Sequence, residues 1–132
     1  MSPEQLVHHE LCFGCGRTNL FGLLMEVEAL GERRVRGRAF VKQDHQGPER
    51  GTAHEGIILT ALSDAMALAA GPEMRARRVE MTIEATVPVG VFLEVEAWAD
   101  DDGADPTATA WVDGRRVATA SGLYRPREAS EA

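Results

Sequence analysis

The sequence lacks an excess of basic charge, which is the electrostatic signature of nucleic-acid binding. Its formal net charge is −7, and such a chain repels a phosphate backbone unless it concentrates its arginines on one face. The two arginine clusters, at 33–38 and 75–78, are interrupted by apolar residues or adjoin an expected turn. We therefore expect no nucleic-acid partner.

Long apolar runs, a basic N-terminal start and abundant cysteine are also lacking. The most apolar segment, 57–70, is shorter than the roughly 20 residues of a membrane span and contains Asp64. Residues 1–6 offer neither a basic start nor an apolar run, so no targeting peptide is indicated. We expect a cytoplasmic protein without a membrane partner, in which Cys12 and Cys15 are thiols rather than a disulfide bridge.

The composition of the chain is that of a globular protein, and we expect one domain that spans residues 1–132. Hydrophobic residues make up 44% of the chain and charged residues 27%. Alternation of apolar and polar residues predicts strands at 22–30, 33–42, 79–87, 91–99, 107–112 and 115–124. Segment 54–70 is rich in Ala and Leu and ends at Gly71-Pro72, which predicts a helix that is apolar on nearly every side. A polar N-terminal segment, 1–20, precedes these elements, and a frayed tail, 125–132, is expected to follow them.

This order of elements predicts an α+β fold. Two strands, one apolar helix and a run of antiparallel strands can share a core if a curved antiparallel sheet wraps around one long central helix. One flank of the helix would remain open in a single chain. A second copy of the chain is the expected cover for that flank.

Five motifs, in order along the chain, carry a family resemblance. They are Cys12-Phe13-Gly14-Cys15-Gly16 with Asn19 and Gly22-Leu23, then His45-Gln46-Gly47-Pro48, then Gly51-Thr52-Ala53-His54-Glu55-Gly56, then strand 79–83 ending at Pro88, and finally 118–122. With these motifs the chain resembles the hotdog-fold acyl-CoA thioesterases of the phenylacetate-pathway and 4-hydroxybenzoyl-CoA type. The resemblance implies a hotdog fold in a homodimer or homotetramer with active sites between subunits. It also implies hydrolysis of an acyl-CoA or acyl-pantetheine substrate, with coenzyme A as part of that substrate and no further cofactor.

The start of the helix is the expected oxyanion site. Thioester hydrolysis builds negative charge on the carbonyl oxygen, and free N–H groups at a helix N-terminus can stabilise that charge. The backbone of Glu55 and Gly56 is placed to supply these donors. His54 either polarises the thioester or orders the preceding loop, and we favour the structural role.

The expected catalytic carboxylate is displaced by one residue. The resemblance places it nine positions after His54, where this chain has Ser63, and Asp64 follows. One helical step turns a side chain by about 100°, so the two residues cannot face the same way. Three interpretations stay open: Asp64 is the base on a locally rotated helix, Glu55 replaces it, or hydrolysis is lost or altered. Ser63 as a nucleophile lacks an activating base, and a structural hydrogen bond to loop backbone is the alternative role for Asp64.

The resemblance also indicates residues that would contact the substrate. His45, Gln46 and Gly47 lie in the loop that would border the thioester pocket, although they could equally order that loop. Thr60 lies on the helix beyond the oxyanion site. Arg78 could meet a substrate carboxylate or a CoA phosphate, or be an exposed arginine at a sheet edge.

Two further alternatives concern metal binding and reaction type. The close spacing of the imidazoles of His8 and His9 and the thiols of Cys12 and Cys15 suits tetrahedral zinc, but we expect no metal because the resemblance treats both cysteines as part of a packed N-terminal segment. In place of hydrolysis, the chain could be a non-hydrolytic hotdog module that binds an acyl or aromatic ligand. It could also be a hotdog lyase or dehydratase in which His54 and Glu55 or Asp64 form an acid–base pair.

Overall fold

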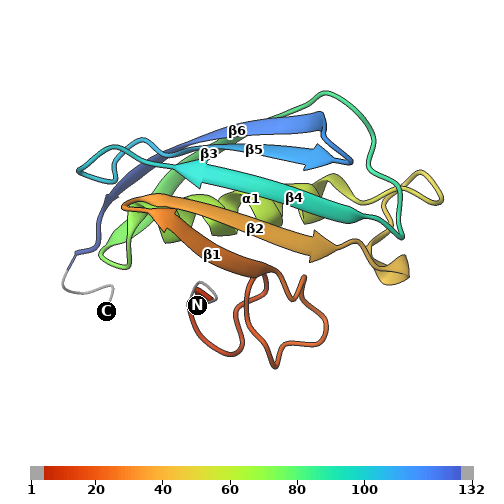
Figure 1. The fold of residues 1–132 in the computed structure, drawn as a ribbon, viewed down its shortest axis with the longest axis horizontal. Coiled ribbons are helices and arrows are strands. Elements are labelled where there is room, and N and C mark those ends of the chain that lie inside the picture. Colours follow the sequence, from red (N-terminus) through yellow and green to blue (C-terminus); the bar gives the residue numbers. More distant parts are fainter. Residues whose placement is uncertain (1–4, 129–132) are drawn as a thin grey trace.

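A six-stranded antiparallel sheet curves around one long helix in the computed structural model, which describes residues 5–128 (Figure 1). The strand order is β1-β2-β4-β5-β6-β3. The elements are β1 (Glu26–Gly31), β2 (Arg34–Phe40), the 3-10 helix η1 (Gln43–His45), α1 (Glu55–Ala70), β3 (Met74–Ile83), β4 (Phe92–Trp98), β5 (Thr107–Val112) and β6 (Arg115–Pro126). The predicted α+β class and hotdog architecture are confirmed.

Strict alternation in the strands produces the core. In β4, Leu93, Val95 and Ala97 are buried, while the intervening side chains face outward. The matching residues of β2 follow the same rule, because β2 and β4 are paired antiparallel in register. All of these inward side chains pack on α1, and together they form one core cluster.

α1 buries one broad face and leaves one flank open. Ala61, Leu62 and Ala65 are completely buried, and the small alanines let the helix approach the sheet closely. On the other flank, Gly56, Thr60, Ser63 and Ala67 are only partly buried, at the three- and four-residue spacing of a single helical face. The predicted open flank of the helix is therefore present.

The neighbouring edge of the sheet is also uncovered within one chain. β3 is an edge strand, paired only with β6. Along it, Val79 and Met81 are half-buried and Ile83 is 40% exposed. An apolar edge of this kind is usually covered in the native state.

Three element boundaries differ from the sequence prediction. β1 begins at Glu26 rather than at 22, because the backbone of Leu24 turns into the left-handed region with a φ of 51°. β3 begins at Met74 and ends at Ile83, so the arginines at 75–78 lie within the strand, next to a bulge. β6 continues through Arg125 and Pro126, which pair with β3, so the predicted fraying does not begin at 125; residues 129–132 lie outside the described part.

The N-terminal segment runs beneath β1 and crosses towards α1 (Figure 1). Its backbone is tied to β1 by the hydrogen bond from the N–H of Leu6 to the carbonyl of Val27 (2.7 Å), and the bond from the N–H of Leu23 to the carbonyl of Phe13 (2.8 Å) closes the loop that leads to β1. Residues 1–4 of this predicted segment lie outside the described part.

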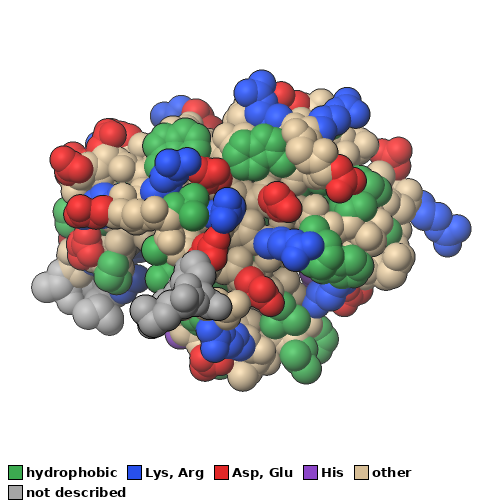
Figure 2. All heavy atoms as spheres, viewed as in Figure 1, with side chains coloured by type: hydrophobic (Ala, Val, Ile, Leu, Met, Phe, Trp, Pro, Cys, Tyr) green, Lys and Arg blue, Asp and Glu red, His purple; other side chains and the backbone are tan. Residues whose placement is uncertain are grey.

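On the face shown in Figure 2, basic side chains are interspersed with acidic ones. Within residues 5–128, no helix has both the length and the apolar character that crossing a membrane requires.

Candidate active site at the start of α1

His54 is the N-cap of α1. Its backbone is extended, and its ring Nδ1 accepts a hydrogen bond from the N–H of Gly56 at 2.8 Å. A nitrogen that accepts cannot carry the proton, so the neutral ring holds its proton on Nε2, which remains available as a donor. The cap also means that the N–H of Gly56 is bonded to the ring in this conformation.

Glu55 is the first residue of α1 and places a carboxylate beside the cap. Its Oε2 lies 3.9 Å from Nδ1 of His54, and its side chain is 62% exposed. The side chain also lines a cavity of about 110 Å³ with Glu49, Ile58 and Ile83. We call this the α1-start cavity. A carboxylate at this position is stabilised by the helix dipole.

The loop before α1 packs directly on the cap. The carbonyl oxygen of His45 accepts from the N–H of His54 at 2.8 Å. A Cβ added to Gly47 would lie 2.8 Å from Cα of His54, so only glycine allows this approach. The side chain of Gln46 bonds to the carbonyl of Gln43 and to the N–H of Gly51. His45, Gln46 and Gly47, which were predicted to contact the substrate, do lie beside His54. The side-chain amide of Gln46, however, forms hydrogen bonds within the loop and so orders it.

The ring of His45 is buried and neutral. It is 5% exposed, and its Nδ1 accepts from the N–H of Lys42 at 3.3 Å. Burial is the main cause that lowers the pKa of His45; the charge of Lys42 lowers it further, and that of Asp44 opposes the shift. Protonating this ring would cost the folded state the Lys42 hydrogen bond.

We predict that the His45→Asn variant loses part of the acid sensitivity of the parent. The unfolded state protonates its histidine below a pH of about 6.5, whereas folded His45 resists protonation. The parent should therefore lose stability as the pH falls from about 6.5 towards the lower folded pKa. Asn retains an acceptor and does not titrate in this range. Urea unfolding from pH 7 to pH 5 should show a shallower slope for the variant, and equal slopes would contradict the assignment.

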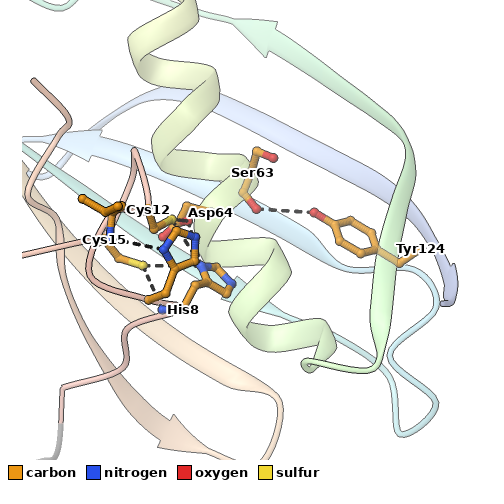
Figure 3. Close-up of polar contacts among 8 residues, drawn as sticks. His8, Cys12, Cys15, Ser63, Asp64 and Tyr124 are labelled. Carbon is orange, nitrogen blue, oxygen red and sulfur yellow. Dashed lines mark hydrogen bonds and ion pairs between the residues drawn. The ribbon is translucent and has the colours of Figure 1, made fainter. Parts of the chain in front are cut away.

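The predicted residues Thr60 and Ser63 share the open flank of α1 with Gly56. The hydroxyl of Thr60 donates to the carbonyl of Gly56 at 2.7 Å. The carbonyl of Ser63 accepts from the hydroxyl of Tyr124 at 3.4 Å (Figure 3). The flank position at which the family resemblance placed the catalytic carboxylate thus carries a hydroxyl here.

Arg78 lies apart from this group, on β3. Its guanidinium is exposed and forms an ion pair with Glu80, two residues along the same strand. The structure does not bring Arg78 to the start of α1.

Asp64 faces away from the open flank, towards the N-terminal segment (Figure 3). Its side chain is 8% exposed, and its Oδ1 lies 3.0 Å from Nδ1 of His8. The same oxygen accepts from the thiol of Cys12 at 3.2 Å. Nine residues of helix separate it from Glu55, or about 13 Å along the axis. A single chain therefore cannot apply both carboxylates to one thioester.

His8 is the residue at this locus that sequence analysis did not place in the active site. The hydrogen bond to Asp64 is the largest cause that raises its pKa, to about 11. The predicted structural bond of Asp64 to loop backbone is thus replaced by bonds to side chains of the N-terminal segment. The spacing of His8, Cys12 and Cys15 was the one sequence signal of this contact.

A larger hollow, of about 390 Å³, lies on β1, β2 and β4. Its lining includes Glu28, Arg36 and Arg38, and Glu28 and Arg36 are ion-paired with each other at 2.9 Å. None of the residues predicted to act on a thioester lines it. We therefore choose the start of α1 as the candidate site because of the side chains that line its cavity, although that cavity is the smaller of the two.

Comparison with known proteins supports the fold at low sequence identity. No protein-family model and no curated protein matches the chain. Among solved structures, the PaaI protein of the E. coli phenylacetic acid degradation operon is 15% identical, with a TM-score of 0.73 over 80% of this chain and 81% of that one. A variant of the phenylacetic acid degradation protein PaaI from Thermus thermophilus is 24% identical, with a TM-score of 0.67 over 76% and 90%.

A third similar structure contains a ligand. It is a hypothetical thioesterase protein with coenzyme A from Streptococcus pneumoniae, 16% identical, with a TM-score of 0.70 over 77% of this chain and 87% of that one. The strand order, the single wrapped helix and these three similarities agree with one another. The chain therefore has the hotdog fold that is found in PaaI-like thioesterase structures.

Proposed function

We propose that the protein hydrolyses a coenzyme A type thioester to a free acid and a thiol. The observation that carries this proposal is the start of α1, where the carboxylate of Glu55 lines a cavity and lies 3.9 Å from the ring of His54, whose Nδ1 accepts from the N–H of Gly56. Hydrolysis needs such a set: donors for the oxyanion and a base for the water. The similarity to a structure with coenzyme A favours a pantetheine thioester as substrate.

In this mechanism the carbonyl oxygen of the thioester binds at the helix start. It accepts from Nε2–H of His54, or from the N–H groups of Glu55 and Gly56 once the ring of His54 swings off Gly56. Glu55 removes a proton from water, and the water oxygen attacks the carbonyl carbon. The tetrahedral intermediate then collapses, the C–S bond breaks, and the proton passes to the leaving thiolate.

The geometry favours Glu55 over Asp64 as the base, the reverse of the order that the sequence suggested. Glu55 is exposed and lines the α1-start cavity. Asp64 is buried and already bonded to His8 and Cys12. Asp64 would have to break both contacts and rotate around the helix to reach the open flank.

The complete site requires a second copy of the chain, in a homodimer or homotetramer. The α1-start cavity, about 110 Å³, is smaller than the roughly 300–1,000 Å³ of pockets that enclose ligands. A two-fold axis that packs two open flanks antiparallel would set the start of one α1 against the middle of the other. The substrate would then lie between subunits, and we place this assembly in the cytoplasm.

The test is thiol release from a panel of aliphatic and aromatic acyl-CoA substrates. We expect Glu55→Gln to lower kcat by about 100-fold, in the range of general-base catalysis, while the variant keeps its fold. Glu49→Gln is the matched control, because Glu49 lines the same cavity without belonging to the helix start. Ser63→Ala should change kcat less than threefold, roughly, because no base activates its hydroxyl.

Two outcomes would overturn this proposal. A parent protein that releases no thiol from any substrate would remove the hydrolase function. Loss of turnover in Asp64→Asn alone, with Glu55→Gln active, would make Asp64 the base.

A non-hydrolytic binding module is the second candidate, and one observation favours it. The flank position of the expected carboxylate holds Ser63, and the N–H of Gly56 is bonded to His54. Calorimetric binding of an acyl-CoA that the parent leaves intact would support this function. Including 3-hydroxyacyl-CoA in the panel tests the dehydratase alternative, in which His54 and Glu55, 3.9 Å apart, would act as the acid–base pair.

A further inference from the structure

Four side chains with metal-binding atoms converge where the N-terminal segment meets α1 (Figure 3). They are His8, Cys12 and Cys15 from the segment and Asp64 from the helix, and their ligand atoms all lie within 4.8 Å of one another. Three of the four were noted in the sequence as a zinc alternative. The fourth, Asp64, joins them only through the fold.

Four of the six distances between ligand atoms in this cluster are close to those of a tetrahedral site. Nδ1 of His8 lies 3.6 Å from Sγ of Cys12, 3.4 Å from Sγ of Cys15 and 3.0 Å from Oδ1 of Asp64. Sγ of Cys12 lies 3.2 Å from the same Oδ1. Zinc with its usual bond lengths to sulfur, nitrogen and oxygen separates neighbouring ligand atoms by about 3.3–3.8 Å. The four distances lie within a few tenths of an ångström of this range, and the widest pair of ligand atoms, at most 4.8 Å apart, would have to approach by up to about 1 Å to complete the coordination.

Several large apolar side chains in and next to the N-terminal segment point outward, while one of its thiols is buried. Leu11, Leu20 and Phe21 are 66%, 70% and 81% exposed. Cys15 is 2% exposed, and Asp64 is 9% exposed. Leu6 and Leu23 pack on the core, so the contact of residues 8–15 with α1 is mainly polar.

The carboxylate of Asp64 is incompletely satisfied by protein groups. Its Oδ2 is buried and has no hydrogen-bond partner within residues 5–128. A buried acceptor without a donor costs free energy unless another group compensates its charge. A cation bound by the cluster would supply that compensation.

The backbone around the two cysteines forms a tight turn that directs both thiols inward. The N–H of Gly16 donates to the carbonyl of Cys12 at 2.9 Å, and the N–H of His8 donates to Sγ of Cys15 at 3.3 Å. A Cβ on Gly16 would lie 2.4 Å from the carbonyl of Glu10, and one on Gly14 would lie 2.5 Å from Cγ of Asp64. Both glycines are required for the turn to close against α1.

We propose that His8, Cys12, Cys15 and Asp64 bind one zinc ion, which fastens the N-terminal segment to the middle of α1. Thiolate and imidazole ligands select zinc over calcium or magnesium, which prefer oxygen. Four protein ligands fill a tetrahedral shell and leave no position for a reactive water, so the ion is structural rather than catalytic. The inference does not depend on the thioesterase proposal, but it gives Asp64 a role other than that of the base.

The test measures zinc in protein purified under reducing conditions without a histidine tag. Elemental analysis should find about one zinc per chain in the parent. Cys15→Ser and Asp64→Asn should each lower the zinc affinity at least tenfold, roughly, in a chelator competition assay. His9→Gln is the matched control, because His9 is the neighbouring histidine outside the cluster. Cobalt substitution should give the intense visible bands of tetrahedral coordination and a thiolate charge-transfer band.

Spectra of the parent keep the test decisive even if a variant fails to fold. A reduced parent that binds neither zinc nor cobalt would overturn the proposal, as would a Cys12–Cys15 disulfide in protein isolated without reductant. Equal losses of affinity in His9→Gln and Cys15→Ser would overturn it too. Failure of thiol release in a zinc-loaded parent would refute the hydrolase function and leave the metal site standing.

Discussion

The Leu62→Ala variant should unfold with a free energy about 3 kcal/mol lower than that of the parent. Leu62 is completely buried in α1, within the single core cluster that joins the helix to the sheet. Truncation removes the transfer free energy of its methyl groups and leaves a cavity that the packed alanines around it cannot fill. Urea denaturation at equilibrium, in the presence of reductant, measures the difference.

Leu20→Ala is the matched control for this prediction. The side chain of Leu20 is 70% exposed, and the carbonyl oxygen of this residue accepts a hydrogen bond from Nζ of Lys42 at 2.9 Å. The free energy of unfolding should change by less than about 0.5 kcal/mol. Similar losses in both variants would show that α1 does not form the centre of the core.

The Met81→Asp variant should dissociate the proposed oligomer and lose thioester turnover with it. Met81 is half-buried on the edge strand β3, where its side chain packs against the core cluster. Burying an unpaired carboxylate at an interface costs several kcal/mol, so we expect the dissociation constant to rise by about 100-fold or more. Analytical ultracentrifugation over a range of concentrations measures that shift.

Thr82→Asp is the control for this prediction, because it places the same charge on β3 but outside the proposed interface. The side chain of Thr82 is exposed on the opposite face of β3, so this variant should remain associated and active. Turnover of Met81→Asp should recover at high protein concentration, because mass action restores the oligomer. A parent that sediments as a monomer while it turns over thioesters would contradict a site between subunits.

The fold was predicted to a large extent because local patterns specify it. The period-two alternation of β2 and β4 determines which side chains enter the core, and the structure buries those side chains. The long apolar segment that begins after His54 is the one helix that the sheet encloses. The boundaries were less predictable. Leu24 leaves the strand through a positive φ, and Arg125 joins β6 because β3 offers a partner.

The candidate site was only half predictable. Gly47, His54 and Glu55 come together as the motifs suggested, because the loop and the helix start are close in sequence. The engagement of Gln46 and Gly56 in local hydrogen bonds was not visible in the sequence. These bonds depend on the conformation of the loop before α1, which its glycines and its side-chain contacts determine together.

By itself, the sequence determined the fold class, the apolar character of the central helix and the rotation that separates Ser63 from Asp64, since each follows from a repeating local geometry. Only the tertiary structure decided that Asp64 meets His8 and Cys12, with 52 residues of sequence separating Asp64 from Cys12. No local period relates positions so far apart. Their contact arises because packing on the sheet fixes the position of α1, and because the N-terminal segment passes beneath β1 and so reaches the helix.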